Sequence, residues 1–386
     1  MASSRDTERS ILRGLTGTMK RFFAELKRRH IYRFGVVYLA LAWLLIQVIV
    51  NVKTPLNLPP WSDTLVITLL AIGFPVILLF AWTLESRSQD APAMVGALDS
   101  VRPATAHAVA PEPIRPEISF CTTASGYRLA HAKAGSGLPL LRTGNWLSHQ
   151  ELDWTNSLFG PFLRDFSRSF QVFTYDGRGT GLSDREVTEF SLDSMVEDME
   201  TVADANRLER FAILAFSQSC AVSITYAVRH PERVSRMVLF GGFAHNFRTP
   251  EEVDAIATLF RQNWGQDNAA TRQIFTSAIL PDATKEEFDA FNEIQRRSIS
   301  PEAAARLFKA CHAIDVRDLA RRVTTPTLVM HSRDEPGVPL ECGREIASLI
   351  PGARFITLES RNHVPVEREP AYKRFLEEAV PFLQKG

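Results

Sequence analysis

Two long uncharged runs near the N-terminus dominate the pattern of hydrophobic and polar positions along the chain. They cover residues 34–52 and 64–84, with 19 and 21 residues, and neither contains Asp, Glu, Lys or Arg. About 20 apolar residues suffice for a helix to cross the hydrocarbon core of a bilayer. The pattern therefore predicts two transmembrane helices within residues 31–85. Their close spacing favours this membrane hairpin over two helices buried in a soluble core.

The charges that flank these runs predict how the hairpin is oriented. Residues 20–33 carry six Lys and Arg, whereas the loop between the runs carries one lysine. Positively charged flanks stay in the cytoplasm, so we expect the basic N-terminus over 1–30 and everything after the second helix on that side. The stretch FFAELKRRHIYRFGVVYLALAWLLIQ resembles a two-helix anchor that precedes cytoplasmic domains in bacterial signalling and cyclase-like proteins. This resemblance implies the bacterial inner membrane.

A polar segment separates the hairpin from the rest of the chain. Residues 86–115 are rich in Ala, Pro and Ser without apolar periodicity, which predicts a flexible linker. Over residues 116–386, short apolar runs alternate with helical patterns. The predicted strands are two within 118–135, then 138–141, 171–175, 211–216, 236–240, 327–331 and 354–358. The predicted helices are 193–207, 221–230, 340–350 and 369–384. This alternation predicts an α/β fold, a mostly parallel sheet covered on both faces.

An insertion over about 243–314 interrupts the alternation. It contains three sequences typical of helix starts, in which a Ser or Thr precedes Pro or stands three residues before Glu. We therefore expect a helical lid. Most of its seven phenylalanines and Trp264 are expected in the core of the lid itself, and the lid would also cover an apolar acyl pocket.

Composition serves mainly to exclude functions. Lys plus Arg and Asp plus Glu both number 44, so the formal net charge is zero, which argues against a nucleic-acid partner. The four cysteines lie far apart with no CxxC pair, which argues against a zinc site or a disulfide framework and fits a reducing compartment. We expect no metal and no cofactor. No pattern in the chain predicts its oligomeric state.

Ser217 is the first candidate catalytic residue. It follows the apolar strand 211–216 and precedes a helical pattern, the setting of a nucleophile elbow. The strained turn needs small residues two positions to either side, and Ala215 and Ser219 meet this requirement. Ser219 also has small residues two positions to either side, so both registers are open. We favour Ser217 as the first residue past the strand. The structural alternative is an N-cap serine.

Two further strand ends carry an acid and a histidine. Asp334 and Glu335 follow the strand 327–331, and a carboxylate there can orient an imidazole. His363 follows the strand 354–358. In parallel sheets such loops meet at one edge. The other histidines near strand or helix ends are His149, His230 and His331.

The order Ser, acid, His at successive strand ends is that of α/β-hydrolases. YDGRGTGLSD, AFSQSCAVSITYAVRHPERV and the acid-to-histidine segment TPTLVMHSRDEPGVPLECGREIASLIPGARFITLESRNH resemble that family. In the family, thirteen residues separate the nucleophile from the His of HPERV, as they separate Ser217 from His230. The family acid, usually Asp, precedes the Val-Pro proline by four residues, which implies Glu335 and leaves Asp334 as its rival. The resemblance covers about 117–386 and is closest to hydrolase-like domains fused to bacterial cyclase or transcription-regulator modules.

The resemblance also implies the parts of the site. The implied catalytic triad is Ser217, Glu335 and His363. The implied oxyanion hole uses the backbone N–H of Gln218 and of Asn145, with Trp146 as its neighbour. Asn145 takes the last position of the family's H-G-x motif, in which Thr143 replaces the histidine.

Two functions remain open from the sequence. The first is a membrane-anchored cytoplasmic serine hydrolase, which cleaves an ester, thioester or lactone of a small apolar acyl substrate through an acyl-enzyme. The second is a ligand-sensing domain that keeps the fold without turnover. The complete Ser–acid–His order favours the hydrolase. The elbow without two flanking glycines and the sensor-like anchor motivate the alternative.

Overall fold

A computed structural model describes residues 65, 68–70, 116–145, 147–264 and 270–385. The basic N-terminus, the linker and nearly all of the predicted membrane hairpin lie outside these residues. Among the described residues, no helix is long and apolar enough to cross a membrane. The fold described below begins at Pro116.

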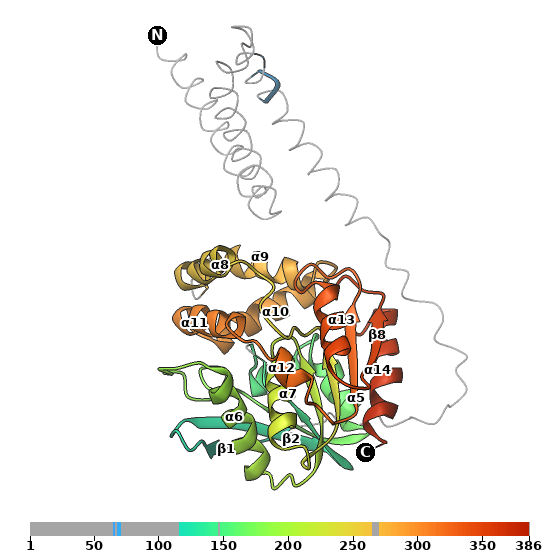
Figure 1. The fold of residues 1–386 in the computed structure, drawn as a ribbon. Coiled ribbons are helices and arrows are strands. Elements are labelled where there is room, and N and C mark those ends of the chain that lie inside the picture. Colours follow the sequence, from blue (N-terminus) through green and yellow to red (C-terminus); the bar gives the residue numbers. More distant parts are fainter. Residues whose placement is uncertain (1–64, 66–67, 71–115, 146, 265–269, 386) are drawn as a thin grey trace, which may run out of the picture. The chain divides into compact units, whose positions relative to one another are not determined.

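One eight-stranded sheet forms the centre of the described fold (Figure 1). Its strands are β1 (Glu117–Thr122), β2 (Arg128–Gly135), β3 (Leu138–Arg142), β4 (Phe170–Tyr175), β5 (Phe211–Phe216), β6 (Val234–Phe240), β7 (Thr327–Ser332) and β8 (Arg354–Leu358). Their order in the sheet is β1-β2-β4-β3-β5-β6-β7-β8. β1 and β2 pair antiparallel, as do β2 and β4, whereas the pairs from β4 to β8 are parallel. The prediction of a mostly parallel sheet is confirmed.

Helices cover both faces of this sheet. They are α4 (Gln150–Thr155), α5 (Gly160–Ser167), α6 (Leu192–Ala205), α7 (Ser219–Arg229), α12 (Arg317–Ala320), α13 (Leu340–Leu349) and α14 (Pro370–Leu383). Successive side chains of a strand point to opposite faces, and β5 is buried along its whole length. Ile213 packs in one core cluster with residues of α6, α7, α12 and α13. Leu214 packs in a second cluster with residues of α5 and α14.

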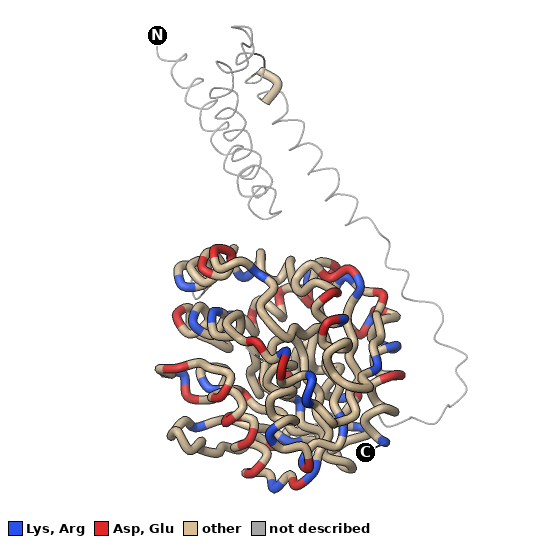
Figure 2. The backbone as a smooth tube through the Cα atoms, viewed as in Figure 1, with Lys and Arg blue, Asp and Glu red and all other residues tan. Residues whose placement is uncertain are grey.

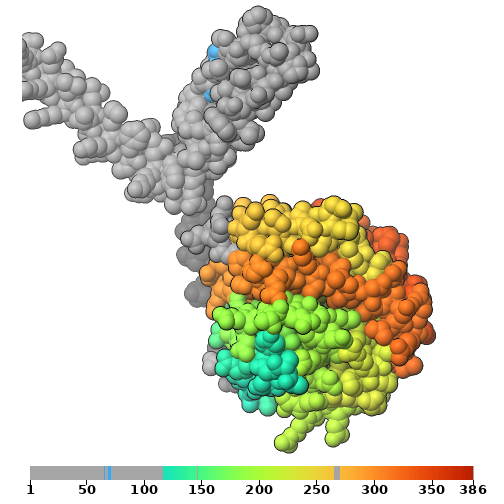
Figure 3. All heavy atoms as spheres, turned by 60° about the vertical axis from the view of Figure 1, so that its left-hand side comes forward, coloured from blue at the N-terminus to red at the C-terminus, as the bar shows by residue number. Residues whose placement is uncertain are grey.

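Four more helices form the predicted lid. They are α8 (Pro250–Asn263), α9 (Ala270–Ile279), α10 (Lys285–Ser298) and α11 (Pro301–His312). Three of them begin where the sequence predicts, because the side chains of Thr249, Thr284 and Ser300 cap α8, α10 and α11. The lid has an apolar core of its own, which includes Phe260 and Trp264. Figure 1 shows these yellow-to-orange helices together at one end of the described fold, and Figure 3 shows the same colours as a layer there.

Charges of both signs are interspersed over the part of the fold shown in Figure 2. Many of them form exposed ion pairs, such as Arg333 with Glu359 and Arg261 with Glu302, each at 2.7 Å. Exposed pairs of this kind contribute little to stability, typically below about 1 kcal/mol.

Candidate active site

The turn after β5 places Ser217 in an unusual backbone conformation. Ser217 has φ +56°, and it is one of two described residues other than glycine with a positive φ. Its N–H donates to Phe240 O at 2.8 Å, and α7 begins two residues later. Such a conformation costs of the order of 1–3 kcal/mol and persists where surrounding structure holds it. A strained serine between a buried strand and a helix is the predicted geometry of a nucleophile elbow.

Close packing against the elbow requires a glycine just after β6. Gly242, just after β6, lies so near that a Cβ atom built on it would come within 2.5 Å of Cys220 Sγ and 3.2 Å of Ser217 O. Only glycine fits at that position without a shift of the elbow. The end of β6 therefore supports the turn from the next strand.

The two candidate serines have different surroundings. Ser219 is fully buried, and its Oγ donates to Phe216 O at 2.7 Å and accepts from Phe216 N at 3.0 Å. Its hydroxyl is thus occupied in holding the first turn of α7. Ser217 instead lines a pocket. The geometry is compatible with a nucleophile at Ser217 and gives Ser219 a local structural role.

The acid loop after β7 separates the two candidate carboxylates. Asp334 is exposed, whereas Glu335 is only 6% exposed. Glu335 Oε2 contacts His363 Nδ1, and Glu335 Oε1 lies 2.9 Å from His331 Nε2. Burial by itself would raise the pKa of Glu335, but the two histidines outweigh it and the pKa is lowered. Glu335 is therefore ionised at neutral pH and in position to orient His363.

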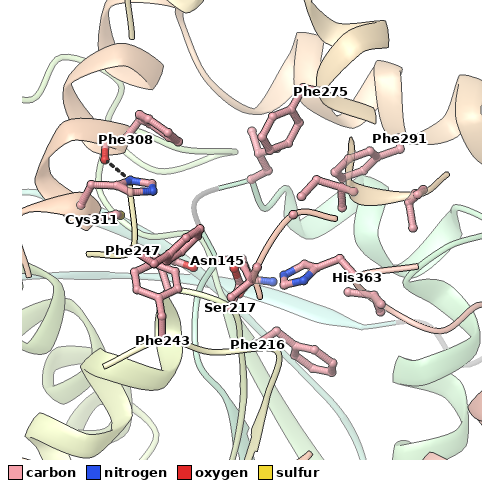
Figure 4. A pocket seen from close by; sticks show the side chains of 18 of the residues that line it. Asn145, Phe216, Ser217, Phe243, Phe247, Phe275, Phe291, Phe308, Cys311 and His363 are labelled. Carbon is pink, nitrogen blue, oxygen red and sulfur yellow. Dashed lines mark hydrogen bonds between the residues drawn. The ribbon is translucent and has the colours of Figure 1, made fainter. Parts of the chain in front are cut away.

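The other histidines considered from the sequence lie elsewhere. His149 is buried, and the ring of His230 lies 3.3 Å from Glu200. His331, at the end of β7, has its Nε2 2.9 Å from Oε1 of Glu335, a contact that sequence reasoning missed. The spacing of four residues between His331 and Glu335 in the sequence was the feature that could have indicated this contact. His363 alone of these four lines the pocket, and Figure 4 shows its imidazole pointing toward Ser217.

Two backbone N–H groups beside Ser217 are available to an oxyanion. Asn145 and Gln218 both line the pocket, and neither backbone N–H donates a hydrogen bond within the described residues. With its side-chain oxygen toward Arg142, the amide of Asn145 accepts from Arg142 Nη2 at 3.1 Å, and its nitrogen donates to Phe216 O, also at 3.1 Å. Arg142 is a buried residue that sequence reasoning missed. It steadies the loop that carries Asn145. Trp146 lies outside the described residues.

The pocket above Ser217 is mostly apolar, and phenylalanines are the most frequent of its lining residues (Figure 4). Its empty space, counting the open mouth, is about 880 Å³. The lid and the loops after the strands supply its apolar walls. The phenylalanines that line it are Phe159, Phe216, Phe243, Phe247, Phe275, Phe291 and Phe308. Within the described part of the chain, no cluster of three or more His, Cys, Asp or Glu is placed to hold a metal ion.

Sequence comparison decides the family. Residues 146–370, more than half of the chain, match the profile of the alpha/beta hydrolase fold family. The chain belongs to this family. Curated relatives of the α/β-hydrolase include pyrrolizixenacetamide deacetylase of Xenorhabdus hominickii, 27% identical over 241 residues, or 60% of this chain and 86% of that protein. They also include 2-hydroxymuconate semialdehyde hydrolase of Pseudomonas sp. strain CF600, 27% identical over 251 residues, or 62% of this chain and 85% of that protein.

Solved structures support the same fold. The enol-lactonase of Burkholderia xenovorans LB400 superposes with a TM-score of 0.58 at 20% identity, over 69% of this chain and 100% of that one. The esterase RhEst1 of Rhodococcus sp. gives a TM-score of 0.59 at 21% identity, over 69% and 98%. Together with the family match and the curated relatives, this structural similarity shows that the chain is an α/β-hydrolase enzyme.

Proposed function

We propose that this α/β-hydrolase is a serine hydrolase that cleaves an ester, thioester or lactone by way of an acyl-enzyme. The observation that carries the proposal is the strained Ser217 in an apolar pocket beside His363, whose Nδ1 contacts the buried Glu335. In the proposed roles, Ser217 is the nucleophile, His363 the general base and Glu335 the residue that orients the imidazole.

The proposed mechanism follows from these positions. His363 Nε2 takes the proton of Ser217 Oγ as the oxygen attacks the acyl carbon. Glu335 stabilises the imidazolium that forms, and the N–H groups of Asn145 and Gln218 donate to the oxyanion. His363 then returns the proton to the leaving group. A water molecule, activated by His363, attacks the acyl-enzyme, and Ser217 Oγ leaves and regains the proton.

The relatives support acyl transfer to water as the reaction class. Their names state a deacetylase, a lactonase and an esterase. The aromatic pocket supports an apolar acyl group as substrate. A ligand sensor without turnover is the competing function. It predicts binding in the same pocket with no covalent adduct on Ser217.

We also propose that the enzyme is anchored in the bacterial inner membrane by helices over about 34–52 and 64–84, with the N-terminus and the hydrolase domain in the cytoplasm. The uncharged runs and the basic flank over 20–33 support this topology. A flexible linker of roughly 30 residues has an average end-to-end distance of about 30 Å. Labelling of single cysteines, one before residue 20 and one in the loop 53–63, tests it. Protection of the loop from an impermeant reagent in intact cells would contradict it.

Steady-state hydrolysis of 4-nitrophenyl butyrate and octanoate tests the proposed activity. We expect turnover by the wild type, a loss of more than about 10³-fold in Ser217→Ala, and little change in the matched variant Ser219→Ala. We also expect kcat/KM to rise with acyl length, because the pocket walls are apolar. Wild-type turnover retained in Ser217→Ala, or an absence of turnover with every ester, would overturn the proposal.

A further inference from the structure

Arg248 is the charged residue in an otherwise largely apolar pocket. Of the described residues that line it, Arg248 is the only Lys, Arg, Asp or Glu. It precedes Thr249, the N-cap of α8, at the start of the lid. The proposed acyl-transfer chemistry assigns no role to this guanidinium.

The surrounding residues hold Arg248 in place. Asn246 makes a tight turn around it, since its Nδ2 donates to Arg248 O at 2.7 Å and its Oδ1 accepts from Arg248 N at 3.0 Å. Arg248 Nη2 donates to Gly337 O at 3.1 Å in the acid loop. Its guanidinium carbon lies 4.9 Å from the centre of the Phe247 ring. The side chain is thus held between the lid and the acid loop, so little conformational entropy would be lost when it binds a ligand.

The charge of Arg248 is not neutralised within the described residues. No carboxylate of the described chain forms an ion pair with it, and its Nε is buried without a hydrogen-bond partner. The nearby Glu252 caps Thr249 N, while Glu335 is held between two histidines. Burial lowers the pKa of Arg248, and Glu252 offsets this only in part. A half-buried cation of this kind is costly unless an anion pairs with it.

We propose that Arg248 binds a carboxylate of the substrate, so that the preferred substrate is an ester or lactone with an apolar body and a free carboxylate. The guanidinium offers a planar fork of N–H donors that matches a carboxylate. The aromatic walls hold the apolar body between this anion and Ser217. The proposal rests on the proposed hydrolase function and adds the chemical class of its substrate.

Matched ester pairs test this proposal on the full-length protein. Mono-4-nitrophenyl adipate and suberate are compared with 4-nitrophenyl hexanoate and octanoate, which have the same number of acyl carbons and end in a methyl group. We expect the wild type to prefer the carboxylate ester in at least one pair. Arg248→Gln should lower kcat/KM for that ester by roughly 10- to 100-fold and change the neutral ester less than about threefold. Arg248→Lys should fall between, because it keeps the charge and loses the fork.

Control variants and outcomes separate the competing explanations. Arg322→Gln, at an exposed arginine outside the pocket, should change neither series. Equal losses on both series in Arg248→Gln would mean that Arg248 only ties the lid to Gly337, and would overturn the proposal. Equal wild-type rates within both pairs would also overturn it.

A binding measurement keeps the proposal testable if the proposed activity fails. If the wild type hydrolyses none of these esters, titration calorimetry with suberate on wild type and Arg248→Gln decides the question. Binding that is lost in the variant supports the carboxylate site without the hydrolase function. No binding to the wild type overturns the site as well.

Discussion

Replacement of Glu335 by glutamine tests the proposed role of the buried acid through the tautomer of His363. Val338 O, an acceptor only, lies 3.0 Å from His331 Nε2, so that nitrogen carries a hydrogen. The same Nε2 faces Glu335 Oε1 at 2.9 Å, and His363 Nδ1 faces Glu335 Oε2. Glu335 Oε2 also accepts from Val338 N at 3.3 Å, whereas Oε1 has no hydrogen-bond partner within the described residues.

Glutamine has one acceptor oxygen and one amide nitrogen, and it carries no charge. If its amide nitrogen faces His363, the imidazole has to accept at Nδ1 and carry its proton on Nε2, where it no longer accepts the proton of Ser217. If its amide oxygen faces Val338 N and His363, the tautomer is kept, but the imidazolium loses the anion that stabilises it. A wrong imidazole tautomer in such a triad lowers kcat by about 10⁴-fold, or ~5.5 kcal/mol of transition-state stabilisation.

The assay is kcat for 4-nitrophenyl octanoate at pH 8, with Asp334→Asn as the matched control. Asp334 is exposed, so its variant should stay within about twofold of the wild type. Thermal unfolding of both variants checks that they fold. A Glu335→Gln enzyme that keeps more than a tenth of wild-type kcat, or a larger loss in Asp334→Asn, would refute the reasoning.

Two further predictions concern the same loops. Gly241 has φ +60°, and a Cβ on it would come within 2.9 Å of His363 Cε1, so Gly241→Ala should displace the imidazole and lower kcat by at least about tenfold; unchanged kinetics would contradict this. The pKa of Glu335 in the folded protein is lower than its ordinary value of 4.5. Ionisation of Glu335 therefore stabilises the fold fully above pH 4.5, and this stabilisation is lost as the pH falls through the lower pKa of the folded protein. The melting temperature of the wild type should therefore fall more steeply below pH 5 than that of Glu335→Gln; parallel curves would show that the carboxylate is not stabilised as described.

The positions of the strands along the chain and of the loops at their ends were predictable, because short apolar runs mark the strands and the chemistry follows those runs. Ser217, Glu335 and His363 each stand within a few residues of a run that becomes β5, β7 or β8. The capped starts of the lid helices were equally predictable, because capping depends on neighbouring residues in the sequence.

Features that depend on contacts between distant segments were not predictable in the same way. The contact between His331 and Glu335 depends on how the loop after β7 turns back, and the bonds of Arg142 depend on the path of the loop after β3.

Helices α4 and α5 were missed for a different reason. The apolar residues Phe162, Leu163 and Phe166 have helical spacing behind Pro161 at the helix start, a signal that was present but not read. The predicted membrane hairpin remains a prediction.

Mapping the adduct of a fluorophosphonate probe tests the central claim most directly. The probe reacts with an activated serine nucleophile, and trypsin releases the peptide of residues 211–229, which contains Ser217, Ser219 and Ser223. Fragment ions that separate Ser217 from Ser219 assign the modified hydroxyl. The account predicts a single adduct on Ser217 that Glu335→Gln slows and Ser217→Ala abolishes. An adduct on Ser219, or none on a folded protein that binds the neutral ester, would contradict it.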